Sequence, residues 1–321
     1  MAVYTDVSDE EVASFATLYG LGEVLSLKGI AEGVENSNYL MVTETGQFIL
    51  TLYEKRVNEA DLPFFLGLME HLAAKGVACP VPVKAPDGQS LHTLAGRPAA
   101  IITFLSGMWP KRIRPPHCAE VGAALAEMHI AGQDFPMARP NDLSVAGWRP
   151  LLDACLDRAD EVKPDLAEAL SRELDWTEAN WPADLPTGVI HADLFPDNVF
   201  FQRDQLTGLI DFYFACTDAF AYDVAICLNA WCFEPDRAFN VTKAKLLLSS
   251  YRARRPFSMT ELNALPLLAR GSALRFLLTR LYDWLNTPPG ALVKPKDPLE
   301  YWAKLRFHQG VSSPAAYGLE A

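Results

Sequence analysis

Short stretches in which apolar and polar residues alternate as in β-strands fill much of the first hundred residues. They lie at residues 23–30, 38–43, 47–54 and 97–105. Between the third and the fourth, residues 59–76 carry apolar side chains at helical spacing and end at a glycine. Residues 81–94 predict a hairpin with Asp87 and Gly88 in its turn. This part of the chain is therefore predicted to form a small antiparallel sheet with one helix inserted after its third strand.

Helical spacing dominates the rest of the chain. A first helix is expected near the N-terminus, where Ser8 and Glu11 have the spacing of a capping box. Another is predicted over residues 115–132, which begin with two prolines. Further helices surround two short strands, at residues 198–201 and 206–212.

These patterns together predict an α+β fold with two lobes. Residues 1–104 are expected to form a β-rich N-terminal lobe, and residues 105–321 a larger helical C-terminal lobe. A chain of 321 residues is long enough for two such cores. Ligands commonly bind in the cleft between two lobes, so we expect the functional site there.

The composition narrows the classes of protein that this chain can be. Hydrophobic residues make up 50% and charged residues 21%, so a large core is expected and global disorder is not. The formal net charge of −12 disfavours a surface for nucleic acid or anionic membrane, because both need clustered positive charge. We expect no nucleic acid, no membrane and no obligate protein partner.

The six cysteines form no C-x-x-C pair and lie in apolar segments, where a free thiol packs as a small apolar group. They are Cys79, Cys118, Cys155, Cys216, Cys227 and Cys232. The first fifteen residues lack the basic and apolar regions of a signal peptide, and no apolar run reaches the roughly 18 residues of a membrane span. These features predict a cytoplasmic protein.

The stretch IHADLFPDNVFF, residues 190–201, sets polar residues among apolar ones. Asp193 and Asn198 are expected in a loop that leads into a strand, because Pro196 opposes a continuous helix. Asp211 ends the next apolar strand, so a hairpin would bring it to the same edge as Asn198. An amide oxygen and a carboxylate suit Mg²⁺, and the second carboxylate is left to orient a hydroxyl and accept its proton.

The same residues have the order and spacing of the catalytic residues of kinases. His191, Asp193 and Asn198 match the His-x-Asp-x4-Asn pattern, and Asp211 matches the later metal-binding aspartate. A purely structural reading, in which these residues cap a turn and close a hairpin, accounts less well for four matches. Ala192 replaces the usual arginine, and no Asp-Phe-Gly or Ala-Pro-Glu is present. The pattern therefore favours a protein-kinase-like fold. It also favours an enzyme that uses ATP and Mg²⁺ to phosphorylate a small molecule.

Two longer stretches, GIAEGVENSNYL at residues 29–40 and IDFYFACTDAFAYDVAICLNAWCF at residues 210–233, narrow this resemblance. With the stretch HADLFPDNVFF they resemble bacterial homoserine kinases of the aminoglycoside phosphotransferase and choline kinase-like superfamily, over nearly the whole chain. The resemblance implies ATP-dependent phosphorylation of the side-chain hydroxyl of L-homoserine to O-phospho-L-homoserine, on the route to threonine.

The resemblance also implies roles for individual residues. Asp193 is the catalytic aspartate, and Asn198 and Asp211 are the Mg²⁺ ligands. His191 belongs to the catalytic site as a residue that hydrogen-bonds the loop. Asp223 is expected to brace the loop, although an ordinary buried acid is an equal reading of it.

The segment EGVENSN, residues 32–38, stands where nucleotide kinases keep the loop that covers the phosphates. We expect Gly33 to let the backbone approach closely and Asn36 and Ser37 to contact phosphate oxygens. A polar hairpin turn without a ligand is the alternative reading.

Thr103, Phe104 and Leu105 resemble the hinge that binds adenine through backbone atoms. Kinase-like folds usually carry a lysine on the third strand, and here Thr51 or a direct neighbour takes that position. Lys28 on the first strand is the candidate to replace it.

Homoserine carries a carboxylate and an ammonium group, so its site should offer an arginine and an acid or carbonyls. Arg275 is the candidate for the carboxylate, against the alternative of a solvated helix face. Tyr213 and Trp231 are candidates for the walls of the site, against the alternative of core packing.

Two other functions remain open on the residues alone. Relatives with the same chemistry accept methylthioribose, choline, fructosamine or aminoglycosides. A nucleotide-binding pseudokinase without catalytic activity is suggested by the missing lysine, whereas the presence of Asp193, Asn198 and Asp211 speaks against it.

Overall fold

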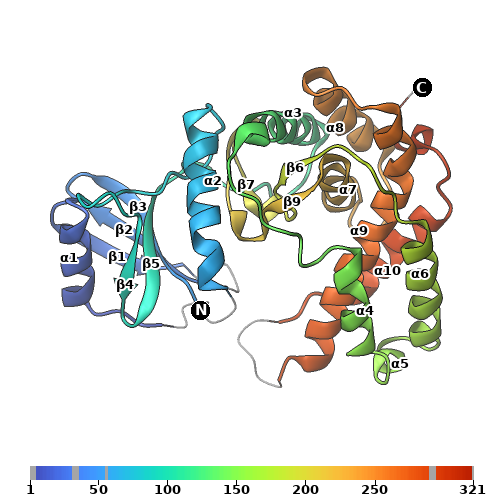
Figure 1. Ribbon diagram of the computed structural model, residues 1–321, viewed down its shortest axis with the longest axis horizontal. Coiled ribbons are helices and arrows are strands. Elements are labelled where there is room, and N and C mark those ends of the chain that lie inside the picture. Colours follow the sequence, from blue (N-terminus) through green and yellow to red (C-terminus); the bar gives the residue numbers. More distant parts are fainter. Residues whose placement is uncertain (1–4, 31–35, 55–56, 289–293, 320–321) are drawn as a thin grey trace. The chain divides into compact units, whose positions relative to one another are not determined.

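The computed structural model describes residues 5–30, 36–54, 57–288 and 294–319. The chain forms two compact units. They are called here the N-terminal unit, Met1–Gly107 with Thr207–Tyr213, and the C-terminal unit, Met108–Leu206 with Phe214–Ala321. The first contains a small antiparallel sheet and the second is mainly helical (Figure 1), which confirms the predicted α+β fold.

The sheet of the N-terminal unit has the strand order β1-β2-β3-β5-β4, and each neighbouring pair is antiparallel. The strands are β1 (Val24–Gly29), β2 (Ser37–Thr43), β3 (Gly46–Leu52), β4 (Leu91–Leu94) and β5 (Arg97–Thr103). Helix α2 (Leu62–Ala74) follows a 3₁₀ turn at Glu59–Asp61 and lies between β3 and β4 along the chain. The expected helix after the third strand is therefore confirmed.

The predicted hairpin over residues 81–94 is only partly correct. Its turn is present, with Gly88 at a φ of 83°. Its two arms, however, both lie along β5, because Pro82 forms a bridge with Ile102 and β4 pairs with Arg97–Ala100. Both arms therefore pair with β5 instead of with each other. Alternation of residues on either side of a turn does not reveal that a third strand is the partner.

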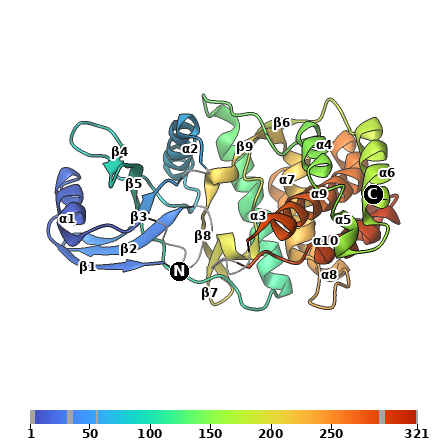
Figure 2. The same cartoon turned by 90° about the horizontal axis from the view of Figure 1, so that it is seen from below.

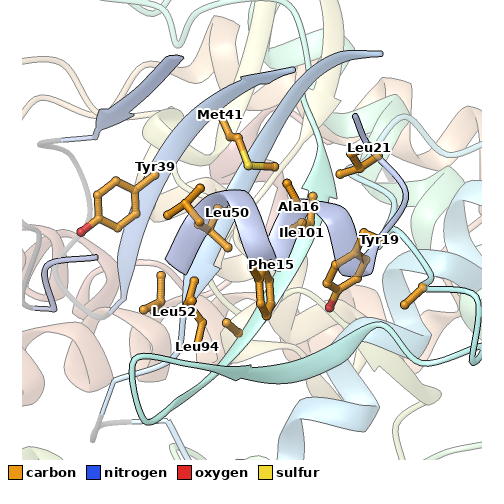
Figure 3. Packing of buried hydrophobic residues seen from close by; sticks show 13 residues of the cluster. Phe15, Ala16, Tyr19, Leu21, Tyr39, Met41, Leu50, Leu52, Leu94 and Ile101 are labelled. Atoms are coloured by element: carbon orange, nitrogen blue, oxygen red, sulfur yellow. The ribbon is translucent and has the colours of Figure 1, made fainter. Parts of the chain in front are cut away.

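One face of the sheet packs against α1 (Asp9–Leu18). The helix begins at the predicted capping box, in which the Ser8 hydroxyl accepts a hydrogen bond from the Glu11 N–H at 3.3 Å. Figure 3 shows apolar side chains of α1, among them Phe15, gathered with Leu50 and other side chains of the sheet in one cluster. This cluster is the core of the N-terminal unit.

The opposite face of the sheet carries polar residues. Residues directly opposite in an antiparallel pair, and alternate residues of one strand, share a face. Asn38 is opposite Thr51, and the Thr51 hydroxyl donates to the Asn38 side-chain oxygen at 2.8 Å. Lys28 is opposite Leu40, two residues from Asn38, so Lys28 shares this face with Thr51 and lies on the side away from the α1 core.

The C-terminal unit is built around α7 (Phe220–Trp231), which is buried on nearly all sides. The other helices are α3 (Pro115–Ala131), α4 (Val145–Asp153), α5 (Ala159–Val162), α6 (Leu166–Asn180), α8 (Val241–Arg254), α9 (Met259–Asn286) and α10 (Pro298–Gln309). Helix α3 packs against α8, and α9 packs against both α7 and α10 (Figure 2). None of the helices in the described part of the chain has the length and apolar character that crossing a membrane requires.

Short strand pairs hold the loops that carry the candidate residues. Strand β6 (Thr187–Ile190) pairs with β9 (Cys216–Ala219), and β7 (Val199–Gln202) pairs with β8 (Gln205–Leu209). The second pair confirms the hairpin expected after Asn198. All six cysteines are buried, which confirms that they pack as apolar side chains.

Candidate active site

The loop of residues 191–198, here called the Asp193 loop, connects β6 to β7. The Phe195 N–H donates to the Asp193 carbonyl at 2.8 Å, and Pro196 begins a 3₁₀ turn that ends at Asn198. The side-chain nitrogen of Asn198 donates to the Asp193 carbonyl at 2.9 Å and to its carboxylate Oδ2 at 3.3 Å. The structure thus brings Asp193 and Asn198 together, and the amide oxygen of Asn198 is the atom that suits a cation.

Asp223, in the first turn of α7, holds the beginning of the Asp193 loop. Its Oδ2 accepts from the His191 N–H at 2.7 Å, and its Oδ1 accepts from the Ala192 N–H at 2.9 Å. Ala192 has a φ of 62°, a left-handed conformation that costs a residue other than glycine about 1–2 kcal/mol. The two bonds therefore stabilise a strained backbone immediately before Asp193.

The pKa of Asp223 lies below its ordinary value, although the residue is fully buried. Burial is the largest influence and would raise the pKa, but the hydrogen bond and charge of His129 and the N–H of His191 outweigh it. The bond to His129 joins Nε2 and the Asp223 Oδ2 at 3.0 Å. His129 was not among the expected site residues, because a histidine at helical spacing among the apolar residues of 115–132 gives no distinctive signal.

Arg275 of α9 lies beside Asp193. Its Nη1 is 3.8 Å from Asp193 Oδ1, and its side chain is only 5% exposed, so it does not lie on a solvated helix face. Its guanidinium stacks over the Phe276 ring at 3.8 Å. The pKa of Asp193 is raised, chiefly by burial, while the charges of Arg275 and His191 oppose the rise. The site therefore contains a partly desolvated carboxylate beside a buried guanidinium.

Trp231, at the end of α7, lies in the interior of the C-terminal unit. It is fully buried, and its indole N–H donates to the Leu194 carbonyl at 2.8 Å. Its ring also packs against Phe201 of β7. This packing supports the Asp193 loop from within the protein. It explains the buried position of Trp231 without any contact to a ligand.

Asp211 and Tyr213 lie in the part of the N-terminal unit that follows β8. Asp211 has a φ of 63°, a left-handed conformation like that of Ala192. The hydroxyls of Tyr213 and Tyr53 are 3.2 Å apart, and the Tyr213 ring packs edge-on against Phe65. Burial, assisted by the charge of Asp211, raises the pKa of Tyr213 to about 12, so it is a neutral phenol at physiological pH.

Two of the residues expected near phosphate are engaged within the protein, and Gly33 lies outside the described residues. The buried Ser37 hydroxyl donates to the Glu54 carboxylate at 2.7 Å and accepts from the Thr5 N–H at 3.1 Å. The Asn36 side-chain oxygen accepts from the Glu54 N–H at 3.3 Å. Glu54, which no sequence pattern singled out, therefore organises the end of this segment.

The expected adenine hinge begins at a residue that already has partners. The Thr103 N–H donates to the Val81 carbonyl, and its hydroxyl accepts from the Val81 N–H, both at 2.9 Å. Phe104 is 37% exposed. Contacts with adenine would therefore fall to the backbone of Phe104 and Leu105.

Asn198 lies in the C-terminal unit and Asp211 in the N-terminal unit, and each carries an oxygen of a kind that Mg²⁺ accepts. Among the described residues, no cluster of three or more His, Cys, Asp or Glu could hold a metal ion. Mg²⁺ typically takes one or two carboxylates together with substrate phosphates and water. One carboxylate, that of Asp211, and one amide oxygen, that of Asn198, fit this pattern.

Comparisons with known proteins concern the chain as a whole. The model of a family described as the phosphotransferase enzyme family matches residues 26–257. The chain is 65% identical over 326 residues to a homoserine kinase of Paramagnetospirillum magneticum, with 100% of both chains covered. It is also 65% identical over 319 residues to a homoserine kinase of Rhodospirillum rubrum, with 99% of both covered.

A solved structure has a similar fold. It is that of an amicoumacin kinase in complex with AMP-PNP, Ca²⁺ and its ligand, and it has a TM-score of 0.70. The similarity covers 94% of this chain and 92% of that one at 15% sequence identity, so it concerns the fold alone.

Proposed function

Because this chain belongs to the phosphotransferase enzyme family, we infer that it transfers a phosphoryl group from ATP to the side-chain hydroxyl of L-homoserine. The product is O-phospho-L-homoserine, an intermediate on the route to threonine. The observation that carries this inference is the identity of 65% with homoserine kinases over 99% or more of their length.

We propose that Asp193 orients the acceptor hydroxyl and accepts its proton as the phosphoryl group is transferred. Its raised pKa makes it a stronger proton acceptor than an exposed aspartate, while the neighbouring Arg275 favours the ionised form. Asp223 supports this role by fixing the backbone of His191 and Ala192.

Asn198 and Asp211 are proposed to hold Mg²⁺ together with the phosphate oxygens of ATP. Bound Mg²⁺ neutralises part of the phosphate charge. The hydrogen bonds that Asn198 makes to the described residues support this, because they use its nitrogen and not its oxygen. The nucleotide analogue and divalent cation in the amicoumacin kinase structure also favour a nucleotide with a metal.

We propose that residues 1–104 bind the nucleotide and that residues 105–321 supply the Asp193 loop and the acceptor site. In the first of these, the turn that includes Gly33 would contact phosphates and the backbone of Phe104 and Leu105 would contact adenine. Lys28 would supply the charge that a third-strand lysine gives in other kinases. The register supports this, since Lys28 shares a sheet face with Thr51 at two strand spacings, roughly 10 Å across the sheet, and two residues along it.

Replacing Lys28 with methionine should raise the KM for ATP about tenfold, because a charge-assisted contact with phosphate is lost. The KM for homoserine should remain unchanged. Steady-state kinetics with each substrate varied in turn measures both. Lys75→Met, at the exposed end of α2, removes the same charge and is the matched control. An ATP dependence equal in the two variants would assign the phosphate contact to another residue.

For the acceptor, we propose that Arg275 binds the carboxylate of homoserine and that Tyr213 contributes to the wall of the site. A buried guanidinium is well suited to a carboxylate. We also propose that the protein acts in the cytoplasm, where ATP is available and its buried thiols remain reduced.

The test is the rate of ADP release with MgATP and L-homoserine, L-serine, L-threonine, choline, methylthioribose or no acceptor. We expect kcat/KM for L-homoserine to exceed that for every other acceptor by at least about 100-fold, because a site built for specific polar contacts rejects analogues that lack them. Turnover with choline or methylthioribose instead would retain the phosphotransferase chemistry and change the substrate. Binding of ATP without turnover of any acceptor would favour a nucleotide-binding protein without activity.

A further inference from the structure

A chain of buried hydrogen bonds leads from the Asp193 loop to a tyrosine on α8. Asp223 of α7 accepts from the loop backbone, and its Oδ2 is also 3.0 Å from His129 Nε2 on α3. The other nitrogen of His129, Nδ1, is 2.8 Å from the hydroxyl of Tyr251 on α8. His129, Asp223 and Tyr251 are each fully buried. Three helices are therefore joined to the loop by polar contacts shielded from water.

The direction of each hydrogen bond follows from the partners at the two ends. Arg255 Nη1 donates to the Tyr251 oxygen at 3.2 Å, so the Tyr251 hydrogen is directed to His129 Nδ1. His129 Nδ1 then accepts, and Nε2 carries the proton that is donated to the ionised Asp223. Burial keeps the pKa of His129 below its ordinary value, which is consistent with a neutral ring. Tyr251 thus selects the tautomer that Asp223 requires.

We propose that Tyr251 is a positioning residue for phosphoryl transfer, acting through His129 and Asp223 on the strained Ala192 that precedes Asp193. Without the Tyr251 hydroxyl, Asp223 alone selects the tautomer of His129, and Nδ1 loses the hydroxyl that it accepts from, so the ring is less firmly held. Asp223 then holds the two loop N–H groups less tightly. The catalytic part of this proposal rests on the function proposed above, whereas the structural part does not.

The variant Tyr251→Phe should lower kcat with homoserine about tenfold, which is about 1.4 kcal/mol and lies within the range for one lost hydrogen bond. The KM for ATP should stay within about twofold of the wild-type value. The chain contains a matched control. His308 Nδ1 lies 2.8 Å from the hydroxyl of Tyr317, but its Nε2 bonds to Asn229, whereas that of His129 bonds to Asp223. Tyr317→Phe removes an equally buried hydroxyl from a histidine and should leave kcat unchanged. Equal kcat values for the two variants would overturn the proposal.

A second measurement does not depend on activity. Amide hydrogen exchange at His191 and Ala192 should be faster in Tyr251→Phe than in the wild type and unchanged in Tyr317→Phe. Nitrogen chemical shifts of His129 in the wild type should show a protonated Nε2 and an unprotonated Nδ1. The opposite tautomer, or unchanged exchange in Tyr251→Phe, would exclude the role of Tyr251 whatever the acceptor substrate. Absence of turnover in the wild type together with the expected exchange would instead count against the proposed function.

Replacements of His129 separate hydrogen bonding from packing. The side-chain amide of His129→Gln can donate to Asp223 and accept from Tyr251, so this variant should retain most of the kcat. His129→Leu fills similar space without either bond and should lose at least as much kcat as Tyr251→Phe. Combining Tyr251→Phe with His129→Leu should add no further loss, because both act through one contact. Additive losses would contradict the proposal.

Discussion

Replacing Asp193 with asparagine should lower kcat by about 10²–10⁴-fold, which is the range in which a positioned proton acceptor contributes. Asparagine has nearly the same shape and still offers an oxygen to the Asn198 side chain, so the loop should keep its conformation. It cannot take the proton of the acceptor hydroxyl. Steady-state kinetics with L-homoserine measures kcat, and equilibrium binding of ATP, expected to change by less than about twofold, shows that the nucleotide site is intact.

The matched control for this variant is Asp197→Asn in the same loop. The Asp197 side chain is 55% exposed, and its nearest cationic partner, Lys296, is 3.7 Å away and also largely exposed. An exposed pair of this kind contributes little to stability, so kcat should remain within about twofold of the wild type. Equal activities of the two variants would remove Asp193 from the proton transfer.

The order of structural elements was readable in the sequence because local patterns determine it. Alternation and turn residues identified the strands of the sheet, and the capping box at Ser8 marked the start of α1. The spacing of polar residues identified the Asp193 loop before any contact was known. These features lie within a few residues of each other in the chain, where steric and hydrogen-bonding preferences act directly.

Contacts between distant residues were not readable in the same way. His129 and Tyr251 meet although 122 positions separate them, and neither stands out from its helical pattern. Ser37, expected in a polar turn, begins β2 instead, where it is buried and its hydroxyl is hydrogen-bonded to Glu54 and Thr5. Which polar residue becomes buried depends on how helices and strands pack, and a single sequence does not contain that information in a local form.

Replacing Arg275 with methionine should lower kcat/KM for L-homoserine by about 10²–10³-fold, within the 2–5 kcal/mol expected when one partner of a buried charged pair is truncated. The loss should appear largely in the KM for homoserine if the guanidinium binds the substrate carboxylate. The pH profile should also change. Arg275 lowers the pKa of Asp193, so its removal raises that pKa. Since the ionised form of Asp193 is the active one, the acidic limb of kcat/KM should move to higher pH.

Arg270→Met on the same helix is the matched control. Arg270 is also largely buried and pairs with Glu173 at 2.5 Å, and its guanidinium stacks over Trp176. Its loss should reduce stability while leaving the KM for homoserine and the pH profile unchanged. An acidic limb that moves in Arg275→Met without a change in the KM would restrict Arg275 to tuning Asp193. A KM that rises without a shift of the limb would restrict it to binding the carboxylate, because the two effects act on different groups.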